Sequence, residues 1–420
     1  FALSSSTIKL SSAPASGSDY FAVIIGSTVN IGTPSNNTVS TAIIQNGAVT
    51  TDKLGADAVT GAKIADDAVN VEHIASGYQL VTTDGQKNTV VGTSAGDSFD
   101  GTNAERNTLI GYNAGTAITT GDQNTAIGVF SLYTNTTGSH NTAAGENALS
   151  YNTTGSSNTA IGDEALEANT TASNNTAIGR QALEANTTGT VNTAVGRASL
   201  AANTTGNYNT AVGNDSLTTA TTGSQNTAVG SYALDATTTG PRNVALGYYA
   251  MTANTTGSDN TAAGCFSLQS NTTGYYNEAF GYQTLKDNTT GNQNTAMGTL
   301  ALGANTTASY NVAIGYNCLN DNTTGAANVA VGAFALDENT TGTLNTALGY
   351  QALSTNITHD GNTAVGYRAL LDSNGGVENT AIGAYAGQNI TTGDFNCVMG
   401  YTALNAGTTA EKSVAIGNES

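Results

Sequence analysis

The 420-residue sequence contains no tryptophan, only three prolines and three cysteines, and only 10% charged residues. About a quarter of the residues of an ordinary soluble domain are charged, so this composition does not suggest a thick globular core under a charged surface. Three cysteines without a Cys-x-x-Cys pair predict neither a disulfide framework nor a zinc site. The sequence shows no run of 18 apolar residues and no signal-peptide pattern, so we expect no membrane span.

Basic residues are also scarce. Eleven Lys and Arg stand against 30 Asp and Glu, which gives a formal net charge of −19. A surface of this sign repels phosphate backbones and anionic lipid headgroups. We therefore expect neither nucleic acid nor an anionic membrane as a partner.

What the chain has in abundance is one repeat, seen for example as NTAVGRASLAANTTGNY at residues 192–208. Its leading Asn recurs every seventeen residues from Asn107 to Asn396, and Ser413 takes the last place, which makes 19 copies separated by 18 equal intervals. Counted from this Asn, position 5 is always Gly, position 4 is always apolar, position 9 is mostly Leu, and positions 12–15 mostly read NTTG. A period this strict indicates a repeated structural unit.

The repeat predicts an all-β fold, a parallel β-solenoid (β-roll or β-helix) of 17-residue coils. Alternation along NTAIG places positions 2 and 4 on one face of a short strand and positions 1, 3 and 5 on the other. We expect a short strand, a corner, a second short strand and a turn in each coil. The predicted core comprises the residues at positions 4 and 9, namely Ile127, Leu132, Ile161, Leu166, Ile178, Leu183, Val195, Leu200, Val212 and Leu217. The predicted turn glycines, expected to supply positive φ angles, are Gly128, Gly138, Gly162, Gly196 and Gly206.

Stacked coils about 4.8 Å apart would extend roughly 90 Å, and they would align the Asn at position 1 and the threonines of the NTTG turn with their own copies in hydrogen-bonded ladders. One Ile and one Leu per coil form a thin core, so we expect several chains to associate. The small residues at position 3 would allow close approach of another backbone. Three chains about one axis are the simplest closed arrangement for such a homo-oligomer. Its expected seam comprises Ala160, Ala177, Ala194 and Ala211.

Three regions differ in pattern. Residues 1–46 contain TIKL (7–10), YFAVIIG (20–26) and TVSTAII (38–44) between turn clusters, and they predict a small β domain. Residues 47–87 carry apolar residues every five positions and predict a thin repeat stalk, with a solvated linker as the alternative. Residues 88–420 are the predicted solenoid. Both ends of the chain look cut, and we expect it to be part of a longer polypeptide.

The sequence resembles known fibrous proteins. NTAxG…AL…NTTG resembles the β-roll repeats of phage tail fibres, and NTAIG is similar to the SVAIG strand of trimeric autotransporter adhesin heads, which are trimeric left-handed β-rolls. The N-terminal SSAPASGSDYFAVIIGSTVNIGTP and the AVTxxKI repeats resemble the front portion of tail fibres from marine and cyanobacterial phages. The resemblance implies a homotrimer, a tail or baseplate attached on the N-terminal side, and a place on the virion outside the cell.

No constellation of catalytic or metal-binding residues emerges, so we expect no enzyme, no cofactor and no metal. The densest acidic group is Asp163, Glu164 and Glu167 with Glu184, and it occurs in one place only. Aromatic residues gather at positions 6 and 7, where we expect them to cover the neighbouring coil. Any contact with a host glycan or protein is expected at Tyr232, Tyr249, Tyr282, Tyr316, Tyr350 and Tyr367.

The expected function is therefore that of a non-catalytic tail-fibre shaft that carries host-attachment elements away from the virion. The alternative is a surface adhesin or extracellular filament of the trimeric autotransporter type, located at the cell surface. Ice binding by threonine rows is disfavoured, because the adjacent threonines of each turn would point to opposite faces.

Overall fold

The computed structural model describes residues 2–4, 7–9, 82–83, 85–99, 103–406 and 408–420. The chain divides into two units, residues 1–70 and 71–420. In the first, β1 (Ala2–Ser4) pairs antiparallel with β2 (Thr7–Lys9), which falls within the predicted strand at residues 7–10. The predicted strands at 20–26 and 38–44 lie outside the described residues, as does the predicted stalk at 47–87 except for its last few residues.

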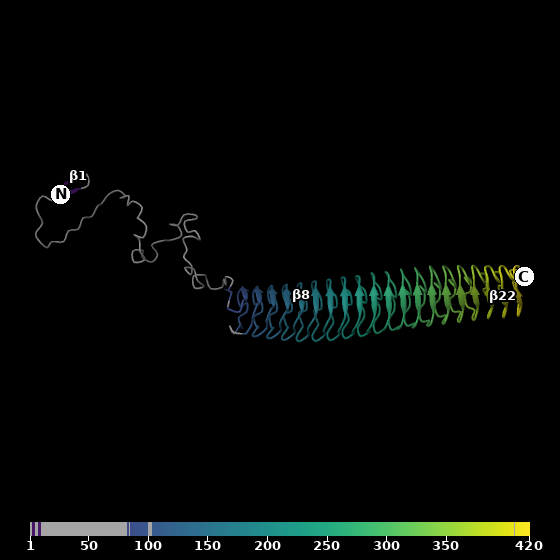
Figure 1. The fold of residues 1–420 in the computed structure, drawn as a ribbon, viewed down its shortest axis with the longest axis horizontal. Helices are drawn as coiled ribbons and strands as arrows, with labels where there is room; N and C mark the ends of the chain where they lie inside the picture. The colour runs from purple at the N-terminus through teal and green to yellow at the C-terminus, as the bar shows by residue number, and fades with distance from the viewer. Residues whose placement is uncertain (1, 5–6, 10–81, 84, 100–102, 407) are drawn as a thin grey trace. The chain divides into compact units, whose positions relative to one another are not determined.

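The second unit is the predicted parallel β-solenoid, and it contains no helix among the described residues (Figure 1). Its sheet begins with β3 (Thr82–Thr83), which pairs antiparallel with β4 (Thr89–Val91). Every later strand has three residues: β5 (Thr108–Ile110), β6 (Thr125–Ile127), β7 (Thr142–Ala144), β8 (Thr159–Ile161), β9 (Thr176–Ile178), β10 (Thr193–Val195), β11 (Thr210–Val212), β12 (Thr227–Val229), β13 (Val244–Leu246), β14 (Thr261–Ala263), β15 (Glu278–Phe280), β16 (Thr295–Met297), β17 (Val312–Ile314), β18 (Val329–Val331), β19 (Thr346–Leu348), β20 (Thr363–Val365), β21 (Thr380–Ile382), β22 (Cys397–Met399) and β23 (Val414–Ile416).

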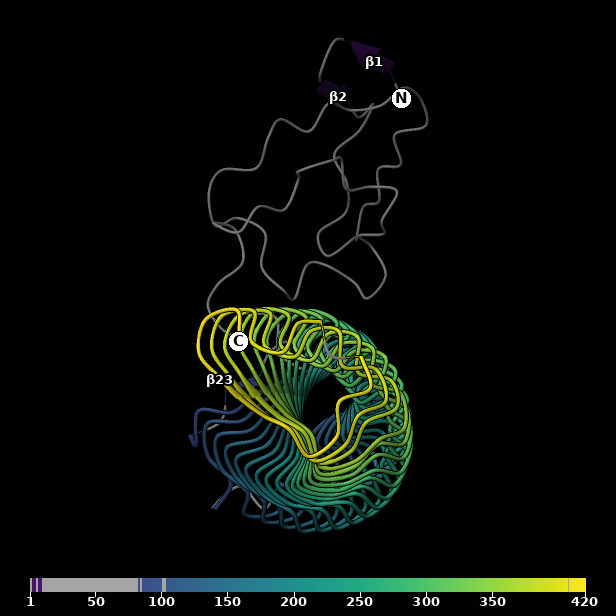
Figure 2. The same cartoon turned by 90° about the vertical axis from the view of Figure 1, so that its right-hand side faces the viewer.

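Each strand pairs in parallel with the equivalent strand of the next coil. The register is the same throughout, so that Thr193 faces Thr210 and Val195 faces Val212. Figure 2, which looks along the solenoid, shows successive coils turned slightly about its long axis, as expected from the twist of parallel strands. In the part of each coil that the structure describes, the expected second strand is absent, because positions 6 to 11 form turns.

The two faces of the strand are oriented opposite to the sequence-based prediction, since position 3 faces the interior of the solenoid and position 4 faces outwards. The expected core residues Ile127, Ile161, Ile178, Val195 and Val212 lie on the outside of the solenoid. The expected seam residues lie inside it and are fully buried, namely Ala160, Ala177, Ala194 and Ala211. These alanines therefore cannot contact another chain. The physical reason is space, since the interior of most coils also has to hold a leucine at position 9 and two asparagines, which leaves room only for a small side chain at position 3. Where position 9 is Gly115, a larger residue fits at position 3, as the fully buried Leu109 shows.

The leucines at position 9 are correctly predicted as core. Leu132, Leu166, Leu183, Leu200 and Leu217 are fully buried, together with the small residue at position 8. Full burial of a leucine side chain contributes about 1.5–3 kcal/mol. The core is thus a column of Leu and Ala rather than of Ile and Leu.

Two asparagine ladders run through the interior. At position 1, the side-chain Oδ1 of Asn107 accepts the backbone N–H of Asn124 at 2.9 Å, and Asn124 Nδ2 donates to the carbonyl of Gly138 in its own coil at 2.9 Å. At position 12, Asn152 Nδ2 donates to Asn135 Oδ1 in the preceding coil at 2.7 Å and to the Gly155 carbonyl at 2.9 Å. The ladder at position 1 was predicted, whereas the one at position 12 was not.

Threonine hydroxyls at position 13 form a third, partly buried ladder. Thr136 Oγ1 donates to the backbone carbonyl of Thr153 in the next coil at 3.0 Å, and the Thr136 N–H donates to the same carbonyl at 2.8 Å. This confirms the expected threonine ladder. Since buried polar groups are costly without partners, these ladders favour one register over all others.

The glycines serve two different purposes. Gly128, Gly162 and Gly196, at position 5, have φ angles of 138°, 136° and 134°, which confirms the predicted positive φ. Gly138 and Gly206, at position 15, do not have a positive φ, so this part of the prediction is wrong. They are required for space, since a Cβ on Gly206 would collide with the carbonyl of Gly223 and with the side chain of Asn203.

Two coils depart from the usual pattern at positions 9 and 12. Gly115 and Gly387 replace the usual Leu, and Ile118 and Ile390 replace the usual Asn three residues later. Both isoleucines are fully buried, and a Cβ on Gly115 or Gly387 would lie 2.9 Å from the Cδ1 of the isoleucine in its own coil. The isoleucine therefore fills the space that the leucine leaves.

Candidate functional site

The most distinctive surface feature is the aromatic corner, which we define as the aromatic side chains at positions 6 and 7 of successive coils. The glycine at position 5 turns the chain away from the strand, so the next two side chains stand at the edge of the coil. One run joins Tyr232, Tyr248, Tyr249, Phe266 and Tyr282, and another joins Tyr316, Phe334, Tyr350, Tyr367, Tyr385 and Tyr401. The coil between the two runs has Thr299 and Leu300 at this corner.

The rings of a run contact one another from coil to coil. The ring centroids of Tyr232 and Tyr249 are 4.8 Å apart in a stacked pair, and those of Tyr350 and Tyr367 are 5.6 Å apart with an interplanar angle of 11°. Most of the other pairs are edge-to-face. Such pairs contribute about 0.5–1.5 kcal/mol beyond their area burial, so the aromatic corner stiffens the stack.

The six tyrosines expected to make surface contacts divide into two groups. Tyr282, Tyr316, Tyr350 and Tyr367 are exposed, whereas Tyr232 and Tyr249 are half-buried. Rings inside a run have aromatic neighbours on both sides, which leaves less of their faces for a sugar ring to stack on. This geometry favours the packing role and leaves the exposed ring edges for polar contacts.

The electrostatics of the corner do not suggest catalysis. A hydrogen bond with Tyr248 raises the pKa of Tyr249. Desolvation is the main cause that raises the pKa of Tyr385, and a hydrogen bond with Tyr367 adds to it. A phenol with a raised pKa stays protonated at neutral pH and is a weak nucleophile. The guanidinium of Arg368 lies 5.2 Å from the centroid of the Tyr367 ring, as in a cation–π contact.

The acidic residues between 163 and 184 lie close together because equivalent positions of successive coils stack on one another. Asp163 forms an exposed ion pair with Arg180 at 3.3 Å, and Glu164 accepts a hydrogen bond from Gln181 Nε2 at 2.8 Å, each at the same position of the next coil.

Glu167 and Glu184 also occupy one position in successive coils. Burial, followed in size by the negative charge of Glu164, raises the pKa of both carboxyls, and the charge of Glu184 adds to the shift of Glu167. Glycosidases place two carboxyls on opposite sides of a substrate. Here the carboxyls lie side by side along the solenoid, so nothing in the arrangement favours hydrolysis.

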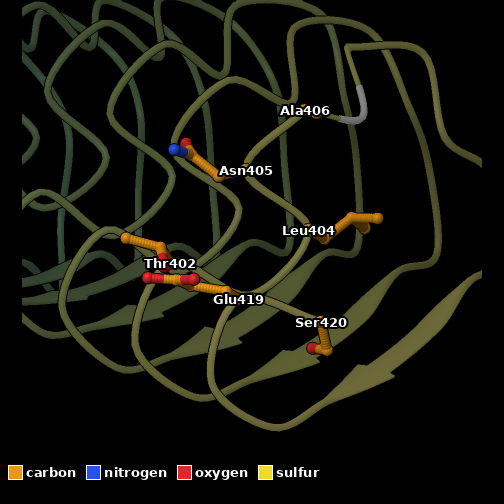
Figure 3. A pocket seen from close by; sticks show the side chains of 6 residues that line it. All are labelled: Thr402, Leu404, Asn405, Ala406, Glu419 and Ser420. Carbon is orange, nitrogen blue, oxygen red and sulfur yellow. The ribbon is translucent and has the colours of Figure 1, made fainter.

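A shallow depression of about 530 Å³ lies at the end of the stack. It is lined by Thr402, Leu404, Asn405, Ala406, Glu419 and Ser420 (Figure 3). The coil that starts at Ser413 covers only part of the preceding one, so the depression is the uncovered edge of that coil. It brings together no set of residues with a recognisable chemistry.

Sequence reasoning missed one surface altogether. The apolar residues at position 4, assigned to the core, form an exposed row on the outer face of the sheet. Alternation alone showed that positions 3 and 4 lie on opposite faces, and the larger side chain was wrongly placed inside. The signal that could have corrected this is the pair of interior asparagines, which leaves little volume within the coil.

Among the described residues, no group of three or more His, Cys, Asp or Glu could hold a metal ion, and no helix is suited to crossing a bilayer. Comparison of the chain with protein-family models, with curated proteins and with solved structures finds no match in any of the three.

Proposed function

We propose that this chain is the shaft of a virion tail fibre, a non-catalytic, homotrimeric structural protein that holds host-attachment elements away from the particle. The observation that carries the proposal is the uniformity of the stack. From β5 to β23 the same coil recurs without an insertion, and every strand pairs in the same register. A repeated surface suits length and stiffness better than discrimination between ligands.

Stiffness has a direct physical basis in this coil. Backbone N–H groups at positions 2, 9 and 13 donate to the following coil, and those at positions 5 and 7 donate to the preceding one, as seen for Thr125, Leu132, Thr136, Gly128 and Phe130. Bending the rod would lengthen many of these bonds at once. The side-chain ladders act in the same direction.

The charge and the sequence resemblance support a location of the shaft outside a cell. A net charge of −19 keeps such rods soluble and apart from anionic surfaces. The resemblance to phage tail fibres favours attachment to a tail or baseplate on the N-terminal side. A host glycan or protein is the expected target of the complete fibre, with weak contacts along the aromatic corner adding only through avidity.

Immunogold electron microscopy tests this proposal. Antibodies raised against residues 107–420 should label fibres projecting from virions in the source sample and should leave uninfected host cells unlabelled. Label on the envelopes of uninfected cells would contradict the virion assignment and support an autotransporter-type adhesin. An unrelated β-solenoid protein serves as the control for antibody specificity.

A further inference from the structure

The outer face of the sheet carries a continuous apolar row. We define the outer stripe as the position 4 side chains of β4 to β23. Most of them are large and well exposed, and thirteen are between 36% and 66% exposed: Ile110, Ile127, Ile161, Ile178, Val229, Leu246, Phe280, Met297, Ile314, Leu348, Ile382, Met399 and Ile416. Since the strands are in register, each member lies directly beside the next.

The outer stripe is larger than a soluble monomer normally exposes. If each residue exposes on the order of 50 Å² of apolar area, the whole stripe exposes on the order of 1,000 Å². The largest apolar patch of a typical monomer is about 300–600 Å². A stable protein interface buries about 800 Å² on each partner, so the stripe has the area of one interface.

The same face is almost free of charge. Although the chain has 30 acidic residues, Glu278 is the only charged residue at positions 2 and 4 of β4 to β23. The carboxylates lie elsewhere on the coil, as Asp163 and Glu164 do at positions 6 and 7. Two strongly acidic chains can therefore meet on this face without bringing their carboxylates together.

We infer that the outer stripe is the surface on which copies of this chain pack against one another, parallel and in register. The coils turn about the solenoid axis (Figure 2), so the stripe winds along the rod. A partner that stays in contact over the whole length must have the same rise per coil and the same twist. A second copy of this chain, running in the same direction, has both.

This inference deepens the proposed fibre by naming the surface that joins its chains. It replaces the alanine seam expected from the sequence, because those alanines are buried within one chain. Three copies whose outer faces surround one axis would cover every stripe and leave the aromatic corners outside.

Two native cysteines provide a test in the full chain. Cys397 is exposed on the outer face at the start of β22, and Cys265 is exposed at the corner after β14. Cys318 is buried, and this burial raises the pKa of its thiol to about 12, so it should not react. Facing sheets lie about 10 Å apart, too far for a direct disulfide, so a short bis-maleimide is the appropriate cross-linker.

With the variant C265S, in which Cys397 is the reactive thiol, we expect cross-linked species of two chains on denaturing gels. With C397T, in which Cys265 is the reactive thiol, we expect chains that remain single. An antiparallel arrangement would place Cys397 opposite the far end of its partner. Absence of cross-linking in C265S, or equal cross-linking in C397T, would overturn the inference.

A second measurement uses charge. Ile161→Lys with Ile178→Lys places two ammonium groups per chain on the outer stripe, at residues that are already 42% and 38% exposed, so the single coil stack should still form. By mass photometry we expect the mass of this variant to fall to that of one chain. The control is Thr171→Lys with Thr188→Lys, which changes exposed turn residues of the same two coils and should keep the assembled mass. A wild-type chain that is already monomeric, or a stripe variant with the wild-type mass, would contradict the inference. Neither result depends on where antibodies bind, so failure of this inference can be distinguished from failure of the virion assignment.

Discussion

Replacing Gly213 with alanine should destabilise the solenoid by more than about 4 kcal/mol, which is exceptional for the addition of one methyl group. Gly213 has a φ of 140°, a conformation that L side chains rarely adopt. A Cβ built there would lie 2.6 Å from both the carbonyl carbon and the carbonyl oxygen of Gly230 in the next coil. The next coil cannot move aside easily, because the Gly230 N–H donates to the Val212 carbonyl at 2.8 Å.

The effect should be local, because each coil contacts mainly its neighbours. Hydrogen exchange of the amides in residues 209–242 should accelerate by about 1,000-fold, since each 1.4 kcal/mol is worth a factor of ten. Thr222→Ala, an exposed turn residue of the same coil, is the matched control and should change exchange little. Equal exchange in the two variants would mean that adjacent coils are not in close contact at this glycine.

Replacing Asn192 with alanine should cost about 2–4 kcal/mol, because it leaves the buried N–H of Asn209 without a partner and removes one of the two hydrogen bonds that the Gly206 carbonyl accepts, the other coming from Asn203 Nδ2. Asn192 is 1% exposed. Its Oδ1 accepts the N–H of Asn209 at 2.9 Å, and its Nδ2 donates to the Gly206 carbonyl at 2.9 Å. The Asn209 N–H cannot reach water while the stack stays closed.

The variant Asn192→Asp separates these two bonds. It keeps the acceptor for Asn209 but turns a carboxylate oxygen towards the Gly206 carbonyl, which disfavours the charged form in the folded state. The pKa of this carboxyl should therefore be higher in the folded chain than in the unfolded one, and its stability should fall as the pH rises from 4 to 7. Thermal unfolding measured by circular dichroism at both pH values checks this, with Thr205→Ala as the exposed control in the same coil. If Asn192→Ala melts like Thr205→Ala, the asparagine ladder does not stabilise the fold.

Much of the architecture follows from the sequence because one coil cannot bury its residues alone. The 17-residue period, the invariant Gly at position 5 and the leucines such as Leu200 predicted the stack, its parallel register and part of its core. The asparagine ladder at position 1 was predictable for the same reason, since equal residues at equal spacing must meet when coils stack.

What could not be predicted depends on the shape of the coil. A strand of three residues with Thr, Ala and Ile has two apolar faces to choose from, and the choice depends on the interior volume. The backbone at positions 7 and 9 was also unpredictable, because Tyr232 and Leu234 adopt φ angles of 58° and 54° although such side chains disfavour this region. Hydrogen bonds to both neighbouring coils hold them there, from the Tyr232 N–H to Asn214 and from the Leu234 N–H to Ala250.

The aromatic corner illustrates the same limit. The sequence placed the tyrosines after the position 5 glycine, but whether they contact one another depends on how far each ring reaches along the axis. Tyr232 and Tyr249 occupy the same position in successive coils and stack, whereas Phe266 and Tyr282 differ by one position and meet edge to face.

The central claim is that every 17-residue unit forms one layer of a rigid rod, and electron cryomicroscopy of the full chain tests it most directly. The rod from β4 to β23 should measure about 90 Å, given about 4.8 Å per coil. Deletion of residues 192–242, which removes three whole coils and joins Val191 to Asn243, should leave the width unchanged and shorten the rod by about 14 Å. Deletion of residues 192–199 alone breaks the period and should disrupt the stack at that point. A rod whose length does not change with the number of whole repeats, or a compact particle in place of a rod, would contradict the account.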